Sequence, residues 1–166
     1  MAAAQSGTAQ SGTRTPAGPV LFGYDGSELA GFAIEQAAMQ LAEGRDALVL
    51  CVWQPADVGF MPIGKRHFDA DNSSEVRDAA EETAGYGASL AEKAGFRSYS
   101  IAVQAAPTWK GIVQMAEERT AGLIVLGSHR RSGLRGHLLG SVAAAVVAHS
   151  ASSVLVVHRG DSPHLQ

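Results

Sequence analysis

Leu123-Ile-Val-Leu126 runs directly into Gly127-Ser-His-Arg-Arg-Ser-Gly-Leu-Arg-Gly-His-Leu-Leu-Gly-Ser141, and the helical pattern Val142–His149 follows. The first stretch is apolar throughout and predicts a buried strand. A glycine- and cation-rich loop between a strand and a helix is typical of a phosphate site, because free N–H groups and the helix dipole favour an anion. The cations of the loop are Arg130, Arg131, Arg135 and, when protonated, His129. The sequence therefore predicts a phosphate-binding loop after this strand.

Short apolar runs elsewhere in the chain predict the remaining strands. The predicted strands are Val20–Phe22, Ala47–Trp53, Tyr99–Val103, Leu123–Leu126 and Ser153–Val157. Runs that are apolar on both faces suit strands covered by helices on both sides.

Helical patterns fill the intervals between these runs. Ser27 is predicted to N-cap a helix that ends near Glu43, where Gly44 stops it. Asn72-Ser-Ser-Glu75 has the form of a capping box and predicts a second helix up to Gly95.

Two further helices complete the alternation of strands and helices. Pro107 suits the first turn of the third helix, and the fourth follows Ser141. Strict alternation predicts an α/β fold, a single doubly wound domain with a parallel sheet. Residues 54–71 have no periodicity and follow a strand, so they are either a lid over a ligand site or a plain connection.

Composition sets the class of protein. The 166 residues carry a net charge of −3, which gives no general attraction to nucleic acid or to a membrane surface. Cys51 is the single cysteine, and the N-terminus lacks the pattern of a secretory signal, so we expect a cytoplasmic protein. Residues 1–18 and 161–166 have the composition of disordered tails, which leaves 19–160 as the folded domain.

These segments resemble the universal stress protein family from about Val20 to His158. Val20-Leu-Phe-Gly-Tyr-Asp-Gly-Ser-Glu28 is similar to the family's first strand and its Asp-Gly-Ser turn, and Leu50–Trp53 stands where the second strand ends. Leu123–His129, Leu138–Val142 and Val154–Val157 resemble its fourth strand, its loop end and its final strand. The resemblance implies a five-stranded parallel sheet of order 3-2-1-4-5 with helices on both faces.

The ATP-binding members of that family carry Gly, two residues, Gly, nine residues, Gly, then Ser or Thr. Gly127 and Gly140-Ser141 match the ends of this motif with the spacing intact, but Arg130 replaces the second glycine. Arg130 either crowds a position that needs glycine or clamps a phosphate with its guanidinium. The sequence leaves both readings open.

The resemblance also implies roles for individual residues. Asp25 would face the ribose or the metal-bound phosphates, the backbone of Val52 would meet the adenine edge, and the glycine motif would contact phosphates and ribose. The implied nucleotide-binding residues are Gly23, Tyr24, Asp25, Val52, Leu126, Gly127, His129, Arg130, Arg131, Gly140, Ser141 and Val142. Two of them have a purely structural alternative: Asp25 in an Asx turn or helix cap, and Ser141 as an N-cap.

The function implied is a non-catalytic, adenine-nucleotide-binding stress regulator, holding ATP with Mg or Mn. Cyclic AMP is an alternative ligand, and a protein-interaction module without nucleotide is an alternative function. Outside the loop no acid–base or nucleophile constellation is visible, so enzyme activity is limited to slow ATP hydrolysis, and no histidine spacing predicts a protein metal site. An apolar edge strand invites pairing with another chain, and the family dimerises through it. The implied homodimer contacts are Val154, Leu155, Val156 and Val157.

Overall fold

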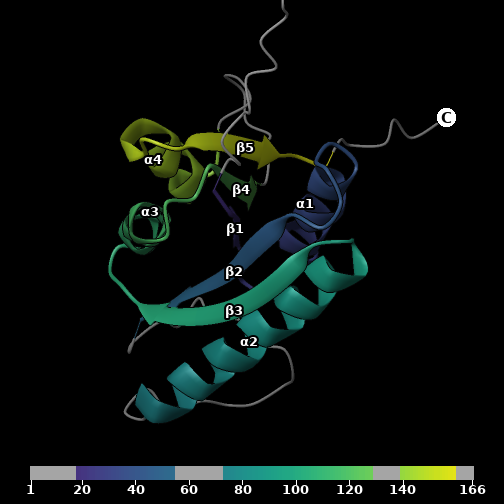
Figure 1. The fold of residues 1–166 in the computed structure, drawn as a ribbon. Coiled ribbons are helices and arrows are strands. Elements are labelled where there is room, and N and C mark those ends of the chain that lie inside the picture. The colour runs from purple at the N-terminus through teal and green to yellow at the C-terminus, as the bar shows by residue number, and fades with distance from the viewer. Residues whose placement is uncertain (1–17, 55–72, 129–138, 160–166) are drawn as a thin grey trace, which may run out of the picture.

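The computed structural model describes residues 18–54, 73–128 and 139–159 of the chain. Strands and helices alternate along it, as predicted (Figure 1). The elements are β1 (Val20–Gly23), α1 (Glu28–Ala38), β2 (Asp46–Trp53), α2 (Ser73–Lys93), β3 (Arg97–Gln104), α3 (Thr108–Glu118), β4 (Leu123–Gly127), α4 (Ser141–His149) and β5 (Ser153–Val157).

The five strands form one parallel sheet in the order β3-β2-β1-β4-β5, which confirms the expected topology. Gly23 at the end of β1 pairs with Leu50 of β2 on one side and with Leu126 of β4 on the other. The carboxyl ends of these central strands therefore meet at one edge of the sheet. The chain leaves β1 toward β2 and enters β4 on the opposite side, so this edge contains the topological switch point.

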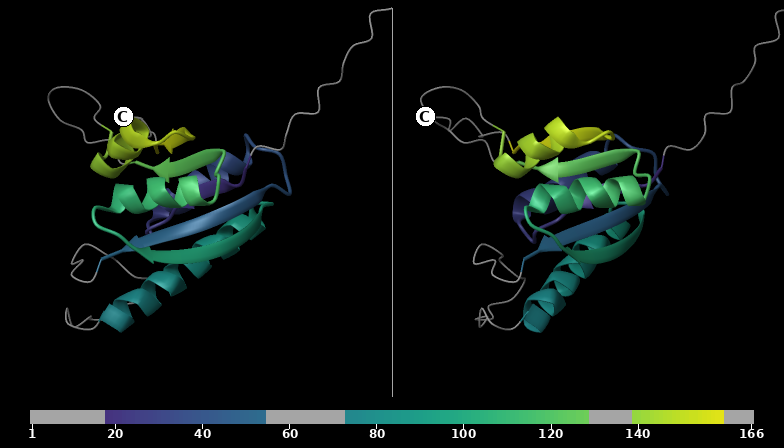
Figure 2. Two further views of the ribbon diagram at one scale, coloured as in Figure 1. Left: turned by 60° about the vertical axis from the view of Figure 1, so that its left-hand side comes forward. Right: turned by 90° about the vertical axis from the view of Figure 1, so that its left-hand side faces the viewer.

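The helices cover the two faces of the sheet in pairs. α1 and α2 pack on one face and contact each other, while α3 and α4 pack together on the other face (Figure 2). None of the helices among the described residues is long and apolar enough to cross a membrane.

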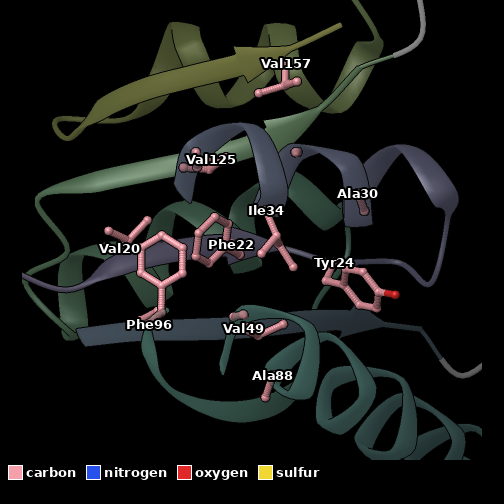
Figure 3. Close-up of a cluster of buried hydrophobic side chains, with 14 residues drawn as sticks. Val20, Phe22, Tyr24, Ala30, Ile34, Val49, Ala88, Phe96, Val125 and Val157 are labelled. Carbon is pink, nitrogen blue, oxygen red and sulfur yellow. The ribbon is translucent and has the colours of Figure 1, made fainter. Parts of the chain in front are cut away.

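Alternate residues of β1 are buried in two separate cores, one on each face of the sheet. Val20 and Phe22 point into the cluster under α1 and α2, where Phe22 meets Phe96 edge to face at 5.2 Å between ring centroids (Figure 3). Leu21 points the other way, into the cluster under α3 and α4 with Ile124. Burial on both faces explains why β1 reads as a continuous apolar run.

The predicted end of α1 is wrong, since the helix ends at Ala38 and not near Glu43. The amides of both Gln40 and Leu41 donate to the carbonyl of Ala37, so the chain tightens into turns there. This lets Leu41 pack against the core beneath α1. The apolar spacing continues past the end of the helix, because a buried turn also needs apolar residues.

Ser27 N-caps α1 as predicted, since the amide of Ala30 donates to its hydroxyl at 3.1 Å. Pro107 is the N-cap of α3 rather than its first helical residue. The predicted capping residue Asn72 and residues 55–71 of the segment without periodicity lie outside the described residues.

Candidate functional site

A cavity of about 150 Å³ opens at the carboxyl ends of β1, β2 and β4. The first turns of α1, α3 and α4 form its sides, so residues from six elements meet at the switch point of the sheet. The lining residues are Gly23, Tyr24, Asp25, Ser27, Leu29, Ala30, Leu50, Val52, Thr108, Ile112, Leu126, Gly127, Val142 and Ala143. Ligands of doubly wound sheets bind at such a point.

Two glycines keep the base of this cavity narrow. A Cβ added at Gly127 would lie 2.8 Å from the carbonyl oxygen of Leu29, and one added at Gly23 would lie 2.5 Å from Cδ2 of Leu126. The backbone of β4 therefore approaches the start of α1 more closely than any side chain allows. Gly127 is therefore needed for this close contact between β4 and α1.

Asp25 lies at the mouth of the cavity and is exposed. Its Oδ1 accepts the amide of Ser27 at 3.0 Å, which is the Asx turn that precedes α1. The structural reading of Asp25 is therefore correct, and it is compatible with a ligand contact. A carboxylate offers about four acceptor positions, of which this bond uses one.

Tyr24 lines the cavity between Gly23 and Asp25, and it is buried, with 4% of its surface exposed. Burial raises the pKa of its phenol to about 12, with smaller contributions from Tyr86, Asp25 and Cys51. The phenol therefore stays protonated at neutral pH. It acts as a neutral polar group here and not as a base.

The wall of the cavity that β2 and α3 form is apolar. Leu50 and Val52 of β2 and Ile112 of α3 line it, and all three belong to the core cluster under α3 and α4 or pack against it. Gly111 lets α3 approach this wall, because a Cβ there would lie 2.7 Å from that of Ala105 and 3.1 Å from Cγ1 of Val52. Of this wall, the sequence predicted only Val52. Leu50 and Ile112 gave no separate signal, because they have the same apolar spacing as core residues.

The start of α4 forms the remaining side. Gly140, not Ser141, is the N-cap, and it has no side chain with which to cap the helix. The first intrahelical bond runs from the amide of Ala144 to the carbonyl of Gly140 at 2.8 Å. The amides of Ser141, Val142 and Ala143 precede it, so the helix offers them no acceptor.

Ser128 holds this helix start from outside. Its hydroxyl accepts a hydrogen bond from the amide of Gly140 at 2.9 Å. Ser128 is only 4% exposed, so this hydroxyl is buried. The sequence does not predict this role, because the two residues are twelve positions apart. A polar residue directly after a buried strand was the only available signal.

The structure thus brings most of the predicted site together. Of the predicted nucleotide-binding residues, Gly140 and Ser141 lie next to the cavity without lining it, and His129, Arg130 and Arg131 lie outside the described residues, as does Arg135. The predicted residues that line the cavity are Gly23, Tyr24, Asp25, Val52, Leu126, Gly127 and Val142.

Three further features that the sequence singles out are β5, the single cysteine and the histidines as possible metal ligands. β5 is an edge strand, with Val154, Leu155 and Val156 half-buried and Val157 buried. Cys51 is buried in β2. Within the described part of the chain, no three His, Cys, Asp or Glu residues are grouped so that they could hold a metal ion.

Comparison with known proteins gives consistent matches. The model of the universal stress protein family matches residues 17–158. The chain is 33% identical over 141 residues to a universal stress protein of Mycolicibacterium smegmatis, covering 84% of this chain and 45% of that protein. Universal stress protein Rv2005c of Mycobacterium tuberculosis also has 33% identity, with coverages of 85% and 45%. The chain therefore spans less than half the length of these curated relatives.

Solved structures share the fold. The structure of MJ0577 from Methanocaldococcus jannaschii is 26% identical with a TM-score of 0.65, covering 89% of this chain and 100% of that one. A universal stress protein in complex with cAMP is 25% identical with a TM-score of 0.60, covering 86% of this chain and 98% of that one.

Proposed function

The chain belongs to the universal stress protein family, and we propose that it binds an adenine nucleotide in the cavity at the switch point of its sheet. One observation carries the proposal: an apolar slot and a helix N-terminus open into the same cavity. A nucleotide has this polarity, with a flat apolar base at one end and an anionic phosphate chain at the other. Its ribose joins the two ends.

The base would lie against the apolar wall. A cavity of about 150 Å³ has the size that admits a benzene-like ring in an apolar protein interior. Leu50, Val52 and Ile112 offer surface to the faces of such a ring. The backbone of Val52, near the end of β2, would meet the polar edge of adenine.

The phosphates would lie at the start of α4. The amides of Ser141, Val142 and Ala143 have no acceptor within the helix, and they favour an anion together with the helix dipole. His129, Arg130 and Arg131 stand in the sequence between β4 and this end of α4, and they would add charge. Asp25, at the mouth of the cavity, would contact the ribose or a Mg or Mn ion carried by the phosphates.

ATP is the ligand that we propose first, because the glycine motif has the spacing of the ATP-binding members of the family. The relative in complex with cAMP supports cyclic AMP as the alternative. The two ligands place different demands on the loop. A triphosphate needs several donors and cations, whereas a cyclic phosphate carries a single negative charge.

We propose binding rather than turnover. The ionisable groups among the described lining residues are Tyr24 and Asp25. The raised pKa of Tyr24 keeps its phenol protonated, and Asp25 is an exposed carboxylate held in the Asx turn before α1. This pair supplies neither a strong base nor an activated nucleophile. We therefore propose a regulatory role, in which the nucleotide is bound and not consumed.

We further propose a homodimer formed through β5. This strand is a sheet edge, and three of its apolar side chains are half-buried. Unpaired backbone groups at such an edge can pair with a second chain.

Mass spectrometry of the small molecules released from purified, denatured protein tests the proposed ligand. ATP is the expected molecule, and cyclic AMP would select the alternative. If no nucleotide is released and none rebinds, the chain acts as a protein-interaction module, and the proposed function is wrong.

A further inference from the structure

Ser128 is an unusual buried polar residue. Thr83 and Ser128 are the buried polar residues of the described chain. The hydroxyl of Thr83 donates to the carbonyl of Ala79 at 2.8 Å, one turn earlier in its own helix, which is ordinary for threonine. Ser128 instead joins three separate segments of the fold.

Each polar group of Ser128 has its own partner. Its amide donates to the carbonyl of Val157 at 2.9 Å, which continues the pairing of β4 with β5. Its hydroxyl accepts the amide of Gly140 at 2.9 Å. Its carbonyl oxygen lies 2.7 Å from Nδ1 of His158. The residue therefore links the end of β5 to the start of α4.

The chemistry of the last contact fixes the direction of the bond. A carbonyl oxygen can only accept, so Nδ1 of His158 must carry the hydrogen and donate it to Ser128. His158 is half-buried and follows β5 directly. It therefore holds the carbonyl group of Ser128, while the hydroxyl of the same residue holds Gly140.

The next residue ties the same segment to α1. Arg159 donates to Glu28 at 3.2 Å, and its guanidinium lies 5.3 Å from the ring centroid of Phe32. Both ionic side chains are exposed, so the ion pair itself contributes little. The contact connects the residue after His158 to α1.

We infer that His158 is a positioning residue for phosphate binding, acting through Ser128 on Gly140 and hence on the start of α4. This inference rests on the proposed function. The amides that would bind phosphate begin at Ser141, next to the amide that Ser128 holds. Small displacements of such donors reduce binding, because their hydrogen bonds depend on distance and angle. A residue at the end of β5 thereby sets the geometry of the phosphate end.

The test uses the full chain without ligand and measures hydrogen exchange of the Gly140 amide by NMR. In His158→Leu this amide should exchange about tenfold faster than in the wild type. His158→Asn should restore slow exchange, because its side-chain amide can replace the Nδ1 donor. Ser152→Ala is a matched control: its hydroxyl donates to Ala121 at 2.9 Å at the other end of β5, so Gly140 should be unaffected.

The same variants are then titrated with ATP. His158→Leu should weaken ATP binding about tenfold, and His158→Asn should bind like the wild type. Unchanged Gly140 exchange in His158→Leu, or equal losses in the Leu and Asn variants, would overturn the inference. If the wild type binds no adenine nucleotide, the proposed function fails, and the exchange data alone decide whether His158 positions α4.

Discussion

Gly85 and Gly87 lie two positions apart in α2, yet their surroundings are opposite. A Cβ added at Gly85 would have no neighbour within 4 Å, whereas one added at Gly87 would lie 2.7 Å from the ring of Tyr24 and 2.8 Å from Val49. The sequence shows both only as residues that weaken a helix. The structure assigns Gly87 a packing role beside the cavity and gives none to Gly85.

Alanine at these two positions should change stability in opposite directions. Gly85→Ala should raise the free energy of unfolding by about 0.5–1 kcal/mol, because it reduces backbone entropy without a clash. Gly87→Ala should lower it by about 1–3 kcal/mol, because Tyr24 or Val49 must move. Urea unfolding of the two variants provides the measurement. Equal shifts of the same sign would contradict the packing around Tyr24.

Tyr24 should make the protein sensitive to alkali. Its phenol ionises near pH 10 in an unfolded chain and at about 12 in the folded protein. Between these values the unfolded state loses the proton first, so the free energy of unfolding falls as the pH rises. Below pH 10 both states keep the proton, and the contribution is constant.

Urea unfolding at several pH values, compared between the wild type and Tyr24→Phe, measures this effect. The wild type should lose stability more steeply above pH 10 than Tyr24→Phe does. Parallel curves would mean that the phenol is not shielded from water. The ultraviolet titration of phenolate gives a second reading, since the variant should lack the last ionisation, at about pH 12.

Arg130 offers a direct choice between two effects on the phosphate loop. If it clamps a phosphate, as we expect beside Arg131 and Arg135, Arg130→Ala and Arg130→Gly should each weaken ATP binding by about 1.5–3 kcal/mol. If it crowds a position that needs glycine, only Arg130→Gly should tighten binding. Calorimetric titration separates the two cases, and a tenfold tighter Arg130→Gly would contradict the clamp.

Among the elements, the ends were harder to predict than the centres. β1 and β4 are apolar runs buried on both faces, and a run of that kind has few alternatives. The sequence places the end of α1 too far along the chain, because Leu41 is apolar whether it lies in a helix or in a buried turn. The N-cap of α4 is Gly140, one residue before the predicted Ser141. The amide of Gly140 donates to Ser128, which is remote in sequence, so no local pattern marks this N-cap.

β5 should hold two chains together if the proposed dimer is correct. Leu155→Lys should give a monomer, because a charged side chain on a half-buried edge strand opposes pairing. Light scattering coupled to size-exclusion chromatography gives the mass, which should be twice 17.2 kDa in the wild type. Val103→Lys on β3, the other edge strand, is the control that should remain dimeric. A Leu155→Lys dimer would place the interface elsewhere.

For the whole molecule, topology was predictable because alternation and resemblance agreed on a doubly wound sheet. That topology brought Asp25 and Gly127 to one edge from opposite halves of the chain. The apolar wall and the Ser128 contacts were not predictable, since Leu50, Ile112 and His158 carry no local pattern that distinguishes a ligand wall or a remote hydrogen bond from ordinary packing.

Calorimetric titration of the wild type and Gly140→Val with ATP and Mg²⁺ tests the central claim most directly. The wild type should bind in the micromolar range, about −8 kcal/mol. Gly140→Val should bind more weakly without unfolding, because its φ of −56° suits any residue, while the side chain would crowd the start of α4 and Ser128. A wild type that binds neither ATP nor cyclic AMP at millimolar concentration would contradict the account, as would a Gly140→Val variant that binds ATP equally well.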